Sequence, residues 1–61
     1  MKHYIAIWDD GHDWGEFEFE SDHRANSKAN IADAKTTAQS RYGYNRAKQM
    51  RICRTMLCNW N

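Results

Sequence analysis

The chain has 61 residues, which is enough for one small domain, 1–61, and too short for two. A chain of this length buries only about 60% of its unfolded surface, so it has little room for an enclosed catalytic pocket, and we expect neither enzymatic activity nor a cofactor. It shows no apolar run long enough to span a membrane and no cationic, apolar leader, which predicts a cytoplasmic protein.

The net charge of +1 conceals a division along the chain. Residues 1–27 carry seven acidic side chains against two basic ones, a net −5, and residues 28–61 carry seven basic against one acidic, a net +6. Either the two halves lie side by side and neutralise each other, or the asymmetry marks a binding surface.

Two strands are predicted near the N-terminus. Residues 2–8, KHYIAIW, are rich in β-branched and aromatic side chains, with Tyr4, Ala6 and Trp8 on one face and the isoleucines on the other. Apolar side chains on both faces indicate a central strand. Residues 16–20, EFEFE, alternate strictly and predict a half-buried strand.

The stretch between these strands, WDDGHDWGEFEFE, is rich in carboxylates and predicts a hairpin loop over residues 10–14. Such a loop would place Ile7 opposite Phe17 and Ile5 opposite Phe19, and a tight turn followed by a bulge at Gly15 would restore the same parity. As a calcium loop the stretch fails at Gly11 and Trp14, so no metal site is predicted.

A helix is predicted over residues 28–42. Ser27 suits the N-cap, Asn26 can adopt a left-handed conformation before it, and Gly43 suits the C-cap. A narrow apolar stripe recurs at helical spacing: Ile31, Ala34, Ala38 and Tyr42. A start at Ser21 is the competing interpretation.

A third strand is predicted over residues 47–57, AKQMRICRTML, with a second helix as the alternative. Cys53 and Cys58 are expected to be reduced thiols, because residues five apart on a strand point to opposite faces. The resulting fold class is α+β, ββαβ: a three-stranded antiparallel sheet of order 2-1-3 with one helix packed on one face.

A lone helix covers one face of such a sheet, so we expect the open face to carry Tyr4, Ala6 and Trp8 and to meet a partner. The simplest partner is a second copy of the chain, which predicts a homodimer. The alternative partner is a different protein. The expected partner-binding residues lie on the open face, in the loop and on the third strand: Tyr4, Trp8, Asp10, His12, Asp13, Trp14, Arg51 and Arg54.

Nucleic-acid binding is the alternative function, suggested by the segment RYGYNRAKQMRICR, in which basic and aromatic residues interleave. The residues that would carry it are Arg41, Tyr42, Tyr44, Arg46 and Lys48. A sequence pI near 7.8 is low for a dedicated nucleic-acid binder.

The stretch YIAIWDDGHDWGEFEFESDHRANSKANIADAK, and within it FEFESDHRANSKANIADA, resembles small proteins encoded by bacteriophages and prophages of Gram-positive bacteria. The resemblance implies a short product that works in the cytoplasm of an infected cell. It implies stoichiometric binding that modulates or inhibits a host protein, such as a defence or nucleic-acid-processing enzyme. It supplies no catalytic residues.

Overall fold

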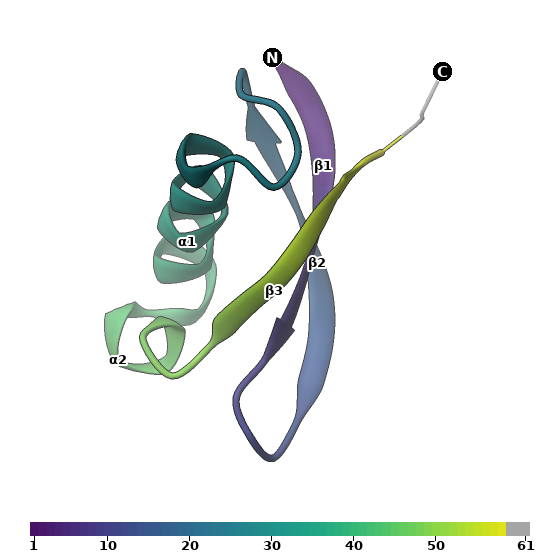
Figure 1. The fold of residues 1–61 in the computed structure, drawn as a ribbon. Helices are drawn as coiled ribbons and strands as arrows, with labels where there is room; N and C mark the ends of the chain where they lie inside the picture. Colours follow the sequence, from purple (N-terminus) through teal and green to yellow (C-terminus); the bar gives the residue numbers. More distant parts are fainter. Residues whose placement is uncertain (59–61) are drawn as a thin grey trace.

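The computed structural model describes residues 1–58. Its elements in chain order are β1 (Lys2–Asp9), β2 (Trp14–Ser21), α1 (Lys28–Tyr42), α2 (Tyr44–Ala47) and β3 (Arg51–Leu57). The strands form an antiparallel sheet of order β2-β1-β3, and both helices lie on one side of it (Figure 1). The expected α+β fold, its strand order and its central strand are confirmed.

The bounds of α1 follow from its caps. The Ser27 hydroxyl accepts a hydrogen bond from the Asn30 N–H at 3.1 Å, and Asn26 before it has φ 66°. Gly43 ends the helix at φ 92°, a conformation that favours glycine, and its N–H donates to the Gln39 carbonyl. The predicted helix is confirmed, and the alternative start at Ser21 is wrong because Ser21 ends β2.

The third strand is confirmed but begins at Arg51, four residues later than expected. After Gly43 the chain turns once more as α2, in which the Ala47 N–H donates to the Gly43 carbonyl at 2.9 Å. A further turn follows, with the Met50 N–H donating to the Ala47 carbonyl at 3.0 Å. These turns use the residues that the sequence had assigned to the start of the strand.

The sheet presents to α1 the face opposite to the one expected. In the register of β1 and β2, Tyr4 pairs with Phe19 and Ala6 with Phe17, whereas the isoleucines pair with glutamates. Tyr4 is 3% exposed and stacks on Phe19 with ring centroids 5.6 Å apart, and Trp8 packs partly buried against the same core. The expected pairings of Ile7 and Ile5 with phenylalanines, and the placement of Tyr4 and Trp8 on the open face, are wrong.

The length of the hairpin loop explains this outcome. The loop spans residues 10–13 and is closed by the Asp10 N–H, which donates to the Asp13 carbonyl at 3.0 Å. With four loop residues, Tyr4 and Ala6 share a face with the phenylalanines of β2. The expected five residues would have put the isoleucines on that face instead. Gly15 holds no bulge; the irregularity lies between β1 and β3, at Ile7 and Trp8.

The core itself favours this face. Ala6 at the centre of the sheet is fully buried, as are Ala34 and, almost, Ala38 on α1. Small side chains on the sheet and on the helix leave room for close approach, and a central isoleucine would hold the helix further away. The expected apolar stripe is present at Ala34 and Ala38, while Ile31 is partly buried and Tyr42 is 40% exposed.

A buried polar network joins the loop between β2 and α1 to both neighbouring elements. The Thr55 hydroxyl donates to Asn30 Oδ1 at 2.6 Å, and Asn30 Nδ2 donates to the His23 carbonyl at 3.0 Å. At the other end of the loop, the Ser21 hydroxyl donates to Asp33 Oδ2 at 2.6 Å. Thr55 and Asn30 are at most 1% exposed, so this network fixes β3 and α1 against the loop.

Candidate binding surfaces

The hairpin loop is organised by one carboxylate, that of Asp10. Its Oδ1 accepts hydrogen bonds from the backbone N–H groups of Asp13 at 2.7 Å and His12 at 2.9 Å, and the neighbouring Asp9 accepts from the Gly11 N–H at 2.6 Å. Gly11 has φ 93°, which a glycine tolerates. The loop is therefore held by its own side chains rather than left to fluctuate.

A brace from α2 reaches the same carboxylate. Arg46 Nη1 lies 2.7 Å from Asp10 Oδ2, and its guanidinium sits over the Trp8 ring at 5.2 Å from the centroid. The hydrogen bonds from Asp13 and His12, then that from Arg46, lower the pKa of Asp10 from 3.8 to about 2. The Asp10 side chain is only 11% exposed, so the loop is fastened to the body of the protein.

The residues beyond this brace face solvent. His12 and Asp13 are exposed, and Trp14, the first residue of β2, has 73% of its surface exposed. We call the exposed set His12, Asp13 and Trp14 the hairpin tip. An exposed indole at the end of a fastened loop is typical of a binding anchor, because Trp is among the residues that contribute most to protein interfaces.

The second surface is the face of the sheet opposite α1, which no element of residues 1–58 covers (Figure 1). The register places its side chains in rows across the sheet, from β2 through β1 to β3. The rows are Trp14–Asp9–Arg51, Glu16–Ile7–Arg54 and Glu18–Ile5–Met56. We call this surface the open face: an apolar ridge on β1, an acidic margin on β2 and a margin on β3 that carries two arginines.

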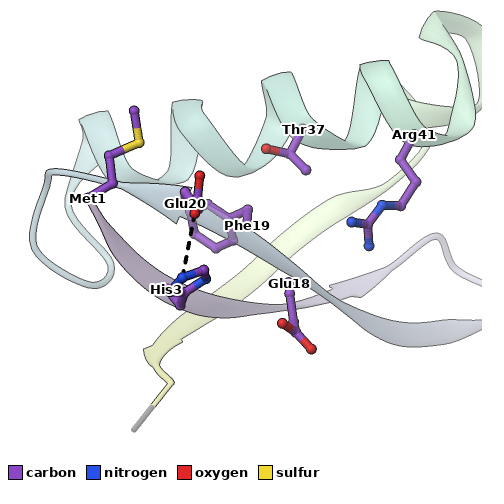
Figure 2. A pocket seen from close by; sticks show the side chains of 7 residues that line it. All are labelled: Met1, His3, Glu18, Phe19, Glu20, Thr37 and Arg41. Atoms are coloured by element: carbon purple, nitrogen blue, oxygen red, sulfur yellow. Dashed lines mark ion pairs between the residues drawn. The ribbon is translucent and has the colours of Figure 1, made fainter. Parts of the chain in front are cut away.

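A shallow groove of about 500 Å³ runs along the outer edge of β2, between this strand and α1 (Figure 2). Phe19 lies at its base, and Arg41 extends from α1 toward the sheet. His3 Nε2 and Glu20 Oε2 lie 3.5 Å apart at one end. Its lining mixes opposite charges on exposed side chains and brings together no group of catalytic geometry.

The basic segment proposed for nucleic acid is partly occupied by contacts within the chain. Arg46 is engaged by Asp10, Lys48 lies over the Tyr44 ring at 5.6 Å, and Tyr42 packs edge-on against Phe17 at 6.0 Å. Arg41, next to Tyr42 in the last turn of α1, lines the groove. The structure thus spreads these five residues over several local contacts and forms no single basic face from them.

Metal and thiol chemistry depend on how the His, Cys, Asp and Glu side chains are placed. In residues 1–58 no group of three or more His, Cys, Asp or Glu side chains is placed to hold a metal ion. Cys53 is exposed and Cys58 partly buried, both as free thiols, and burial together with the Glu18 carboxylate raises the pKa of Cys58. Within the same residues, no helix combines the length and hydropathy that crossing a bilayer requires.

Comparisons with protein-family models, with curated proteins and with solved structures found no match. Functional assignment therefore depends on the geometry of the hairpin tip and the open face.

The structure brings some of the expected site residues together and separates others. Trp8 and Asp10 meet at the brace, Arg51 and Arg54 lie on the open face as expected, and Tyr4 belongs to the core. The residues that sequence reasoning missed are Ile5 and Ile7, which form the ridge of the open face. No sequence signal would have placed them there, because the face they occupy depends on whether the hairpin loop has four or five residues.

Proposed function

We propose that this protein acts by stoichiometric binding of another protein, with Trp14 of the hairpin tip as its anchor. The observation that carries the proposal is the 73% exposure of this indole at the start of β2, next to a loop fastened by Asp10. Binding through a loop that is already ordered costs less conformational entropy than binding through a mobile one. An apolar residue of this size is otherwise expected inside the protein.

The side chains of the hairpin tip indicate what kind of surface its target presents. The indole calls for an apolar pocket, and Asp13 beside it, with the acidic margin of β2 behind, favours a rim of basic side chains. A basic rim is typical of nucleic-acid-processing enzymes, because they bind phosphates. The resemblance to phage-encoded proteins supports a target in a bacterial host, and we propose a host defence or nucleic-acid-processing enzyme that is modulated or inhibited by this contact.

The proposal is tested by cross-linking from the tip itself. A photoreactive phenylalanine in place of Trp14, in cells that express the chain, should capture one host protein, which is then purified and titrated. Trp14→Ala should weaken its binding by about 100-fold, corresponding to roughly 2–3 kcal/mol for an interface anchor. Tyr44→Ala, which removes another exposed aromatic residue away from the tip, is the matched control and should bind as the wild type.

Two outcomes would contradict the proposal. Equal binding by Trp14→Ala and the wild type would exclude the tip as anchor. Retardation of DNA or RNA that collapses as salt rises from about 50 to 200 mM would favour the nucleic-acid alternative instead.

A further inference from the structure

We propose that the open face is the interface of a homodimer whose two-fold axis runs parallel to β1. This inference concerns a surface that shares only Trp14 with the hairpin tip, and it does not depend on the identity of any target. It follows from the order of charges across the rows of the sheet.

The central row is acidic on one margin and basic on the other, and the flanking rows add Glu18 to the acidic margin and Arg51 to the basic margin. In the central row, Glu16 on β2 and Arg54 on β3 flank Ile7 on β1, each directly paired with it. The next row places Glu18 on the same side as Glu16. The face therefore carries opposite charges on opposite margins, with isoleucines between them.

Symmetry decides how a second copy fits this pattern. A two-fold axis parallel to the strands exchanges the β2 and β3 margins and leaves each row at its own height. Glu16 of one copy then faces Arg54 of the other, twice in the dimer, and Ile7 meets Ile7 at the axis. An axis perpendicular to the strands would instead place glutamate margin against glutamate margin. The first arrangement is the one that pairs opposite charges in the central row. Asp9 of the outer row would also lie near the axis, but its carboxylate accepts the Gly11 N–H at 2.6 Å and so turns toward its own loop.

The same arrangement agrees with sheet packing. Two sheets that stack face to face keep their strands nearly aligned, within about 30°, with apolar side chains between them. The partly buried Ile5 and Ile7 would complete their burial there. Three strands of about eight residues offer a face of only about 15 by 25 Å, so we expect a weak dimer, with Kd on the order of 50 µM.

The test is sedimentation velocity of the purified chain from about 5 to 500 µM, a range that brackets the expected Kd. Glu16→Arg and Arg54→Glu should each weaken dimerisation by at least about ten-fold, because each creates two like-charge contacts across the axis. Both substitutions in one chain restore opposite charges at each contact and should return Kd to near the wild-type value. Lys35→Glu, a charge reversal on the exposed side of α1, is the matched control and should leave Kd unchanged.

Ile7→Asp distinguishes a dimer formed through the open face from one formed by strand pairing at the sheet edges. It places two carboxylates together at the axis and should abolish the dimer, while circular dichroism verifies that the variant folds. A monomeric wild type over the whole range, single reversals without effect, or an Ile7→Asp chain that still dimerises would each overturn the proposal. Because no target is present in these measurements, their failure would leave the role of Trp14 intact.

Discussion

At the scale of single residues, Asp10 links the hairpin loop to α2 through charge. Its pKa falls from 3.8 to about 2 on folding because the ionised carboxylate accepts backbone N–H groups and the Arg46 guanidinium. A carboxyl group whose pKa is lowered by folding stabilises the fold at pH values above its pKa in the unfolded chain. This stabilisation is lost as the pH falls through its pKa in the folded protein.

We therefore expect the free energy of unfolding of the wild type to exceed that of Asp10→Asn at neutral pH, and the difference to shrink as the pH falls from about 4 to about 2. Urea unfolding at a series of pH values measures it. Asp13→Asn removes an exposed carboxylate of the same loop and controls for the loss of one charge. A difference that is constant across this range would show that the carboxylate is not held as described.

Thr55 is the other residue on which distant parts of the chain converge. Its hydroxyl donates to Asn30 and accepts from the Asn26 N–H at 2.8 Å, in a site that is 1% exposed. Thr55→Val keeps the volume but removes the partner of the buried Asn30 Oδ1 and of the Asn26 N–H, which belongs to an exposed residue. We expect it to lower the free energy of unfolding by about 1–3 kcal/mol, mainly through the buried Asn30 oxygen.

Urea denaturation measures this loss, with Thr36→Val as its control. Thr36 is exposed on α1, and its hydroxyl bonds only to the Ala32 carbonyl of its own helix, so its change should stay within about 0.5 kcal/mol. Similar losses at the two positions would mean that the buried network adds no stability.

At the scale of elements, the hairpin depends on a glycine that a tryptophan covers. Gly15 pairs with Trp8 across the strands, and the indole ring lies where a side chain would be. The indole N–H is buried there and donates no hydrogen bond within residues 1–58, so packing and the Arg46 guanidinium position the ring.

Gly15→Ala should destabilise the protein, because the new Cβ would lie 2.9 Å from Trp8 Cζ2. We expect a loss of about 1–3 kcal/mol by overpacking, although alanine suits a strand better than glycine does. The same substitution in a Trp8→Leu background should cost much less, and the double-mutant cycle gives the coupling between the two positions. Equal costs in both backgrounds would show that the ring does not set the requirement for glycine.

At the scale of the whole molecule, the arrangement of elements could be predicted from the sequence, but the assignment of faces could not. The alternation at Phe17 and Phe19 and the caps at Ser27 and Gly43 are local signals, and they give two strands and a helix. Which face of β1 is buried depends on whether the loop has four or five residues. A single residue there exchanges every side chain between the core and the open face.

The candidate site divides in the same way. The acidic stretch was recognisable as a loop, and exposure of its polar residues followed from that. Its fastening by Arg46, 36 residues away, depends on the extra turn α2, which carries no strong local signal. The interpretation of an uncovered face was sound for the fold, although Ile5 and Ile7 occupy it in place of Tyr4 and Trp8.

The orientation proposed for the dimer has a consequence for the tip. An axis parallel to β1 leaves both hairpins pointing the same way, so the two hairpin tips would lie at one end of the assembly, each Trp14 beside Arg51 of the other copy. Two anchors on one body raise the effective concentration of the second contact once the first has formed. A weak single contact could then act as a strong one on a repeated target.

Asn26 forms hydrogen bonds with the outer edge of β3, where a fourth strand would otherwise pair. Its side-chain Oδ1 accepts the Thr55 N–H at 2.7 Å, and its backbone N–H donates to the Thr55 hydroxyl. Because Thr55 lies on a border strand, this N–H would otherwise be free to pair with an extended peptide. The connection before α1 thus blocks strand addition at this point of the β3 edge.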